Sequence, residues 1–379
     1  MIPFNKPFLT GKETQYITDA VTSGKLSGNG IFTKKCQQFF EEHYGFKKAL
    51  MTTSCTDALE MSAILSDISP GDEVIAPSFT FVSTVLAFVR QGAKIIFADS
   101  YPDNPNIDPE DIRGKITEKT KAIIPVHYAG VACDMDAILD IARNNNLLVV
   151  EDAAQAIDSY YKGRPLGSIG DMGCFSFHET KNVIAGEGGL LTINRDNYIR
   201  RSEIIWEKGT NRSEFFRGEV NKYGWVDTGS SFLPSEIISA FLWAQLENLD
   251  MIQTRRKEIW HYYFSHLKPL EDKGKIKLPV IPEYATNNGH LFYIVCGSLE
   301  ERSRLIEYLK EQDILAVFHY LSLHKSDFYK NKFPELSGED NYLPNCDRFA
   351  DCLLRLPLFY NLEDKDLDHI VKCVKKFYE

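Results

Sequence analysis

The chain has 379 residues, of which 44% are hydrophobic and 25% are charged, a composition typical of a globular protein long enough for two domains. Its formal net charge is -10 with no cluster of Lys and Arg, so we expect no nucleic-acid partner. The N-terminus lacks the basic and then apolar pattern of a signal peptide, and no apolar run reaches the roughly 18 residues of a membrane span. We therefore expect a cytoplasmic protein that does not bind membranes.

The spacing of cysteine and histidine gives no sign of a disulfide framework or a metal site. The eight cysteines include no Cys-x-x-Cys pair, and in a chain without an export signal this scatter predicts free thiols. His319 and His324 are close in sequence, but a structural metal site needs more ligands at suitable spacing. We assign no metal.

Residues 1–45 form a lead-in with two expected helices, 13–22 and 32–44, separated by a glycine-rich turn. Gly28 and Gly30 make a Gly-x-Gly, but no third glycine follows at the required spacing and no strand precedes them. A dinucleotide-binding motif is therefore not indicated, and no Gly-Lys-Ser/Thr phosphate loop occurs either.

From residue 49 onward, short apolar runs alternate with helical segments. Runs of Val, Ile and Leu without polar alternation are typical of parallel strands that are buried on both faces. The pattern predicts an α/β sheet with helices on both faces. The expected strands are 49–52, 73–76, 94–99, 122–126 and 147–152, and the expected helices between them are 56–65, 80–90 and 135–144.

The second half of the chain contains more helix. A compositional boundary near 245–255 divides the sequence into a large domain, 1–250, and a smaller C-terminal α+β domain, 251–379. The expected strands here are 190–193 and 291–295, and the expected helices are 198–206, 233–249, 252–267, 303–312 and 364–377.

Lys181 lies between a strand-like run that contains Ser176 and the glycine turn Gly186-Glu187-Gly188-Gly189. An amine attacks carbonyls only when it is neutral, and an enclosed site lowers the pKa of a lysine enough for that. We therefore interpret Lys181 as a Schiff-base lysine. The alternative is a solvated surface charge, since the chain has 43 Lys and Arg residues.

Two further features of the expected sheet carry chemistry. The segment Thr53-Ser54-Cys55-Thr56 lies where a strand passes into a helix, so its hydroxyls and N–H groups can bind a phosphate, or can merely cap the helix. Asp152 ends an apolar strand, which places a carboxylate at the edge of the sheet where ligands bind. The alternative is that Asp152 caps the turn through Ala153-Ala154-Gln155. A phosphate site, a carboxylate for a ring nitrogen and a lysine for an aldehyde are what pyridoxal phosphate requires.

These motifs resemble the sugar-nucleotide aminotransferases of the DegT type over essentially the whole chain. The resemblance implies the aspartate aminotransferase fold, a pyridoxal-phosphate transferase of fold type I with a mostly parallel sheet between helices and a smaller C-terminal domain. The motifs are Glu151-Asp152-Ala153-Ala154-Gln155, Phe175-Ser176-Phe177-His178 with Lys181, Gly186-Glu187-Gly188-Gly189, and His319-Tyr320 with Leu323-His324.

The resemblance also implies roles for single residues. Lys181 would bond to the cofactor aldehyde and then move protons, Asp152 would pair with the pyridinium nitrogen, and Gln155 would lie near the ring hydroxyl. In the same way it implies that Ser54, Cys55 and Ser176 hold the phosphate and that Phe81 stacks on the ring, although Phe81 reads equally well as a core aromatic.

One position departs from the family pattern. Many relatives have Gly-x-Asn-Tyr-Arg before the helix expected near residue 234, and their asparagine reaches the cofactor phosphate across a dimer interface. Here Ser231 stands at that position, and its shorter side chain puts the cross-subunit contact in doubt. Dehydratase relatives replace the lysine by histidine, whereas this chain keeps Lys181.

Within the family, several segments resemble the dTDP-4-amino-4,6-dideoxygalactose transaminases of enterobacterial common antigen synthesis. That subgroup implies L-glutamate as amino donor, dTDP-4-dehydro-6-deoxyglucose as acceptor, and a homodimer with shared active sites. The alternatives are the gluco product, amination at C3, or a cofactor-binding regulator without turnover. The segments are 125–133, 177–182, 207–213 and 356–362.

The substrate contacts are expected in two places. The basic loop with Lys208, Arg212 and Arg217 is the candidate for the nucleotide diphosphate, although charged loop residues are usually just solvated. His319 and Tyr320 are the candidates for the sugar end.

Overall fold

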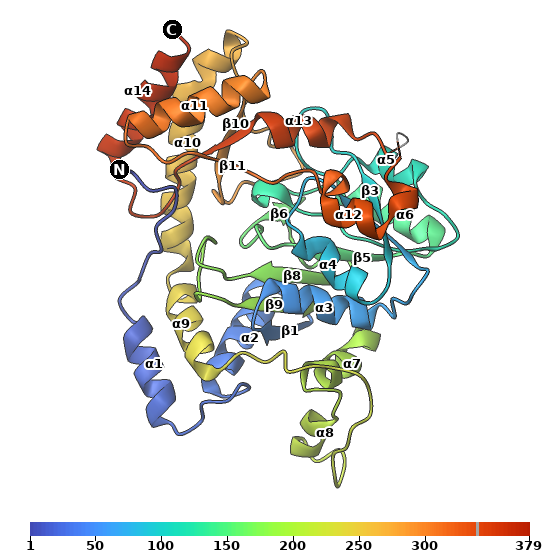
Figure 1. The fold of residues 1–379 in the computed structure, drawn as a ribbon. Coiled ribbons are helices and arrows are strands. Elements are labelled where there is room, and N and C mark those ends of the chain that lie inside the picture. Colours follow the sequence, from blue (N-terminus) through green and yellow to red (C-terminus); the bar gives the residue numbers. More distant parts are fainter. Residues whose placement is uncertain (339–340) are drawn as a thin grey trace.

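A seven-stranded sheet lies at the centre of the computed structural model, which describes residues 1–338 and 341–379 (Figure 1). Its strand order is β1-β9-β8-β5-β4-β2-β3. The strands are β1 (Lys48–Thr52), β2 (Glu73–Pro77), β3 (Lys94–Ala98), β4 (Thr120–Ile123), β5 (Leu148–Asp152), β8 (Met172–Ser176) and β9 (Gly189–Ile193).

The middle of the sheet is parallel, as the unbroken apolar runs predict, because β3, β2, β4, β5 and β8 pair in parallel. At one edge β9 runs antiparallel to both β8 and β1, so the sheet is mostly parallel, as the resemblance implies. Parallel neighbours are usually joined by a crossover helix, whereas the segment 177–188 between β8 and β9 contains no helix, as is typical of an antiparallel return. This segment carries Lys181.

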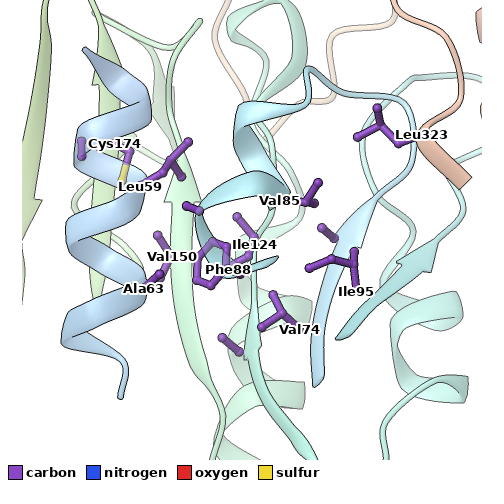
Figure 2. Close-up of a cluster of buried hydrophobic side chains, with 14 of the residues drawn as sticks. Leu59, Ala63, Val74, Val85, Phe88, Ile95, Ile124, Val150, Cys174 and Leu323 are labelled. Atoms are coloured by element: carbon purple, nitrogen blue, oxygen red, sulfur yellow. The ribbon is translucent and has the colours of Figure 1, made fainter. Parts of the chain in front are cut away.

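Helices cover both faces of the sheet. On one face, Leu59 of α3 and Phe88 of α4 pack against Val74, Ile124 and Val150 of the sheet region, as Figure 2 shows. On the other face the core includes side chains of α2, α6 and α9. The helices named here are α2 (Ile31–Tyr44), α3 (Cys55–Leu65), α4 (Ser83–Arg90), α6 (Met135–Asn145) and α9 (Glu236–Leu246).

The lead-in helices α1 (Glu13–Thr22) and α2 pack against α9. Helix α2 has no side-chain cap of its own, because Gly30 is its N-cap residue. Instead the buried carboxylate of Glu236 accepts the backbone N–H groups of Gly30 (2.9 Å), Phe32 (2.7 Å) and Thr33 (3.2 Å). A Cβ at Gly30 would lie 2.5 Å from this carboxyl group, so glycine permits the close packing of Glu236 against α2.

The C-terminal part builds a three-stranded sheet of order β10-β12-β11 around its own core. Ile2 of the lead-in pairs with Ile314, so the N-terminus lies on this part of the protein (Figure 1). The elements are α10 (Leu249–Asp272), β10 (Phe292–Val295), α11 (Leu299–Glu311), β11 (Val317–Phe318), α12 (Asp327–Lys332), α13 (Pro344–Cys352), β12 (Leu353–Leu356) and α14 (Asp364–Phe377).

Most predicted elements have the right type but shifted ends. The helix expected over 80–90 begins at Ser83, and the strand expected over 122–126 ends at Ile123. The helix expected over 233–249 is shorter, and the next helix begins at Leu249. The remaining elements are α5 (Pro109–Gly114), β6 (Tyr160–Tyr161), β7 (Arg164–Pro165), α7 (Asp196–Trp206), α8 (Arg212–Phe216) and the short 3-10 turns Tyr128–Gly130, Leu323–Lys325 and Pro334–Leu336.

Within residues 1–338 and 341–379, no helix combines the length and apolarity needed to cross a membrane. The same residues contain no group of three His, Cys, Asp or Glu side chains placed to hold a metal ion.

Candidate active site

Lys181 lies in the loop between β8 and β9, where its backbone N–H donates to the carbonyl of His178 at 2.9 Å. The side chain is half-buried. Burial lowers the pKa of Lys181, and the charge of Arg355 lowers it further, whereas Cys55 and Asp152 act in the opposite direction. The site thus favours a neutral amine, the form that attacks carbonyls.

Asp152 is the last residue of β5 and is almost completely buried. One carboxylate oxygen accepts the Thr84 hydroxyl at 2.7 Å, and the other accepts the Ala154 N–H at 3.1 Å. Burial raises the pKa of Asp152, while these hydrogen bonds and the charge of Lys181 favour the ionised form. Its position at the carboxyl edge of the sheet is the one predicted for a ligand-binding carboxylate.

Gln155 and Tyr320 meet although they are far apart in the sequence. The Gln155 side chain accepts the Ala129 N–H at 2.7 Å and donates to the Tyr320 hydroxyl at 3.1 Å. His319 stacks on the Tyr320 ring with centroids 3.5 Å apart, and its Nδ1 lies 2.7 Å from the Tyr128 hydroxyl. Burial lowers the pKa of His319 well below its usual value, so its imidazole is neutral at pH 7.

The N-terminus of α3 lies at the same edge of the sheet. Ser54 caps this helix, because its hydroxyl accepts the Asp57 N–H at 3.1 Å, and Cys55 is the first helical residue. A Cβ at Gly189 would lie 2.3 Å from the Ser54 carbonyl oxygen, so only glycine permits this close approach. Gly189 pairs in turn with Ser176 of β8, which places the two serines on either side of it.

Phe81 precedes α4 and is 56% exposed, so it is not a core aromatic. Its ring centroid lies 6.3 Å from that of Tyr320. The structure therefore brings Phe81 and Tyr320 to one place and leaves the Phe81 ring open to a ligand.

The basic loop belongs to the segment 207–231, which contains α8 and which we call the α8 loop. Figure 1 shows α8 beside α7 at one end of the protein. Arg217 pairs with Glu203 at 2.8 Å and with Glu219 at 2.7 Å. The guanidinium of Arg212 lies over the ring of Phe216 at 5.1 Å. Lys208 and Ser231 are both exposed, and Ser231 bridges to Glu207.

Sequence reasoning missed four side chains that belong to this site: Thr84, Tyr128, His290 and Arg355. Thr84, Tyr128 and His290 carry no local signal, because their contacts come from the fold. Arg355 is the one charged residue in the apolar strand Leu353-Leu354-Arg355-Leu356. Because charged residues are rarely buried, this pattern could have marked Arg355 as a candidate site residue.

The amino-acid sequence matches the DegT/DnrJ/EryC1/StrS aminotransferase family over residues 7–375, nearly the whole chain. The chain belongs to this family. It is therefore an aminotransferase, and its cofactor is pyridoxal phosphate.

Individual proteins and solved structures are similar to this chain over nearly its whole length. Protein MJ1066 of Methanocaldococcus jannaschii is 34% identical, and the match covers 99% of this chain and 97% of that protein. The spore coat polysaccharide biosynthesis protein SpsC of Bacillus subtilis is 32% identical, and the match covers 99% of this chain and 96% of that protein. Among solved structures, the putative sugar aminotransferase Spr1654 of Streptococcus pneumoniae in its PMP form superposes with a TM-score of 0.91 at 28% identity, covering 100% of this chain and 99% of that one.

The side chains of this aminotransferase fit the cofactor that the family uses. A half-buried lysine with a lowered pKa suits an aldehyde, and a buried carboxylate at Asp152 suits a ring nitrogen that must stay protonated. The helix N-terminus at Ser54, packed against Gly189, suits a phosphate.

Proposed function

We propose that this protein transfers the amino group of L-glutamate to the C4 ketone of dTDP-4-dehydro-6-deoxy-D-glucose. The products are 2-oxoglutarate and dTDP-4-amino-4,6-dideoxy-D-galactose. The reaction type rests on the family match, together with a half-buried lysine in the loop after β8 and a buried carboxylate at the end of the neighbouring strand β5. The choice of sugar rests on the segments 125–133, 177–182, 207–213 and 356–362, which resemble the transaminases that make this product.

Lys181 is the proton-transferring group in the proposed reaction. When bound, pyridoxal phosphate supplies an aldehyde that accepts amines and a ring that delocalises the electron pair left by proton removal. Lys181 would hold the aldehyde of the bound cofactor, and its amine, when free, would take the proton from the donor carbon and return it at the neighbouring position. In the second half it moves a proton in the reverse sense, onto C4 of the sugar.

The surrounding side chains hold and orient the reactants. Asp152 keeps the ring nitrogen protonated, since an ionised carboxylate stabilises the adjacent positive charge. Ser54, Cys55 and Ser176 bind the phosphate at the N-terminus of α3. The remaining cofactor contacts we assign are Gln155 beside the ring hydroxyl, Phe81 on the ring face, and Ser231 near the phosphate.

The sugar nucleotide would meet two groups of residues. His319 and Tyr320 contact the sugar end, and their position beside Gln155 supports this assignment. Lys208, Arg212 and Arg217 contact the diphosphate from a second subunit, so that a homodimer shares its active sites. The existing pairs of Arg217 with Glu203 and Glu219 would then have to open for the ligand.

The product would supply a surface polysaccharide of the enterobacterial common antigen type, made in the cytoplasm. The Bacillus subtilis relative SpsC carries a polysaccharide biosynthesis name, which supports this general role.

The experiment that tests the function mixes the purified protein and pyridoxal phosphate with dTDP-4-dehydro-6-deoxyglucose and L-glutamate. NMR couplings among H3, H4 and H5 of the product then assign the new amine. A small H3–H4 coupling is expected for the galacto sugar. A large one would assign the gluco sugar, an amine at C3 would move the reaction to that carbon, and absence of any amino sugar would refute this substrate.

A further inference from the structure

A cavity of about 340 Å³ lies beside β1, the edge strand of the large sheet, between α2, α7 and α8. This volume falls within the range of roughly 300–1,000 Å³ that is usual for small-molecule sites. We call it the β1-edge cavity. None of its lining residues belongs to the loop 177–188 or to the N-terminus of α3, and it shares only Arg217 with the contacts proposed above. It is therefore separate from the cofactor site.

The wall of the β1-edge cavity is fixed to the free edge of β1 by hydrogen bonds. The Oε1 atom of Gln37 in α2 accepts the Met51 N–H at 3.2 Å. The indole N–H of Trp206 in α7 donates to the Met51 carbonyl at 2.7 Å. Gln37 and Trp206 both line the cavity, so two of its walls are held in place before any ligand binds.

Gln37 also has a donor that the protein does not use. The residue is 9% exposed, and its Oε1 atom is taken by Met51. The NH₂ group of the same amide makes no hydrogen bond with any residue in 1–338 or 341–379. Because buried polar groups usually have partners, this donor indicates an acceptor inside the cavity.

Positive charges outnumber negative charges in the cavity wall. Lys34, Lys48 and Arg217 line it together with a single carboxylate, Glu203. One oxygen of Glu203 pairs with Lys48 at 3.1 Å and the other pairs with Arg217 at 2.8 Å. Lys34 has no carboxylate within 4.0 Å among the residues that the structure describes. The cavity therefore has an excess of two positive charges, although the chain carries a net charge of -10, and it favours a dianion.

The remaining wall suits an organic group attached to that anion. The cavity has room for on the order of ten water molecules, so a phosphate group alone would fill only part of it. Phe216 lines the cavity and is 68% exposed, which leaves its ring open to stacking by a planar group. Asn29 and Ser213 make only long hydrogen bonds to Glu207, at 3.4 Å and 3.3 Å, and can turn to the hydroxyls of a ligand.

We propose that the β1-edge cavity binds a nucleoside monophosphate. Lys34, Lys48 and Arg217 hold the phosphate, whose charge of about −1.5 to −2 near pH 7 matches the excess positive charge of the wall. The amide of Gln37 donates to the ligand, and the base stacks on Phe216. This inference goes beyond the proposed transamination and does not depend on which sugar is aminated.

Isothermal titration calorimetry of the cofactor-loaded protein with AMP tests the proposal. AMP is the probe because its base differs from that of the sugar nucleotide proposed for the active site. One AMP should bind per chain with Kd below about 1 mM, and inorganic phosphate and adenosine should each bind at least about tenfold more weakly. Absence of AMP binding at this concentration would refute the proposal, as would equal affinity for phosphate or for adenosine.

Lys34 and its neighbour Lys35 give a matched pair of variants. Lys34→Gln should weaken AMP binding about tenfold or more, because hydrogen bonds to a charged group contribute strongly to binding. Lys35 does not line the cavity, since its ammonium lies 5.4 Å from the rings of Phe32 and Trp243, and Lys35→Gln should bind AMP like the wild type. Unchanged affinity in Lys34→Gln, or equal losses in both variants, would overturn the assignment.

Gln37→Glu tests the inside of the cavity. The variant keeps an oxygen for the Met51 N–H but places a negative charge where the phosphate should lie. AMP binding should then become undetectable while the urea midpoint stays close to the wild-type value. Wild-type affinity in this variant would contradict the proposal. If the variant does not fold, the exposed Lys34 still decides the question.

Hydrogen exchange shows where AMP binds. The ligand should slow amide exchange in residues 213–217 and leave the active-site loop 177–188 unchanged. Slower exchange in 177–188 alone would mean that AMP occupies the active site, and the proposal would be wrong. If AMP binds as expected but the wild-type protein does not aminate the proposed sugar, only the proposed function fails.

Discussion

The active-site edge of the large sheet and the α8 loop both present polar and aromatic side chains, but they are held in different ways. Asp152 and Gln155 are buried, and each has two hydrogen-bonding partners within the chain. In the α8 loop, Phe216 is 68% exposed and Trp225 is 84% exposed. Side chains of the first region are fixed before any ligand binds, whereas large exposed aromatics of the second are typical of a surface that another molecule covers.

Replacing Lys181 tests the preorganised region most strongly. Lys181→Ala should reduce transamination by at least about 10³-fold, because the proton transfer loses its positioned base. Steady-state formation of the amino sugar measures the loss. Lys268→Ala, an exposed lysine paired with Glu271 on α10, should retain full activity. If Lys181→Ala kept a borohydride-reducible bond to the cofactor, another residue would be the Schiff-base lysine.

Removing the charge of Asp152 should have the second largest effect. In Asp152→Asn, kcat should fall about 10²- to 10³-fold, as for other preorganised electrostatic contacts, because the neutral amide no longer stabilises the protonated ring nitrogen. Stopped-flow absorbance of the glutamate half-reaction measures this step. The exposed Asp136, which pairs with Lys162, gives the control Asp136→Asn. Equal rates in wild type and Asp152→Asn would contradict the assigned role.

The close approach at Gly189 can be broken sterically. In Gly189→Ala the new methyl group would lie 2.3 Å from the Ser54 carbonyl, which should lower the free energy of unfolding by about 1–3 kcal/mol and weaken cofactor binding. Urea denaturation and cofactor titration measure the two effects. Gly114→Ala, where a methyl group meets nothing within 4 Å, is the matched control. Unchanged cofactor affinity would separate Gly189 from the phosphate site.

The buried histidines of the preorganised region predict a pH dependence. Burial lowers the pKa values of His290 and His319 in the folded protein well below 6.5, their value in the unfolded chain. Below pH 6.5 the unfolded chain therefore binds protons that the folded chain does not. The free energy of unfolding consequently decreases as the pH is lowered, by up to about 1.4 kcal/mol per pH unit for each imidazole. Urea midpoints between pH 7 and pH 5 should fall less steeply in His290→Asn, and an identical slope would rule this histidine out as a cause.

The α8 loop should give the smallest change in stability. Arg217→Gln removes half-exposed ion pairs to Glu203 and Glu219, and pairs of this kind stabilise a protein by at most about 1 kcal/mol. If the loop binds the diphosphate, the same variant should raise KM for the sugar nucleotide while leaving the glutamate half-reaction unaltered. A large decrease in the free energy of unfolding together with an unchanged KM for the sugar nucleotide would mean that the α8 loop stabilises the fold and does not bind the substrate. The α8 loop and the active-site edge of the sheet would then no longer differ in the way described above.

Local patterns were enough to predict the core of the sheet and to select the residues that we propose for the cofactor. Apolar runs placed the strands that end at Asp152 and Ser176, and the glycine turn after Lys181 marked the loop where the lysine lies. The family resemblance then connected these positions through the needs of one cofactor. The roles assigned to the site residues, including Ser231 and the α8 loop, and the division of the chain near residue 250 stay predictions.

The rest depends on contacts between distant segments. Thr84 reaches Asp152, and Gln155 reaches Tyr320, across 68 and 165 residues of chain, and no periodicity encodes such pairs. The antiparallel return of β9 was missed for a related reason, because an apolar run does not reveal strand direction. The contact between the Phe4 ring and the Arg355 guanidinium joins residues that are even farther apart in the sequence.

The carboxylate of Glu236 at the N-terminus of α2 has a consequence for how the chain folds. The hydrogen bond between Glu236 and Gly30 closes a loop of 206 residues, so the first turn of α2 gains its cap only after α9 has been synthesised and docked. The lead-in is therefore expected to stay frayed on a nascent chain and to join the native structure late, since long-range closure is slow. In a pulse-labelling hydrogen-exchange experiment, the amides of Phe32 and Thr33 should gain protection after those of the parallel strands.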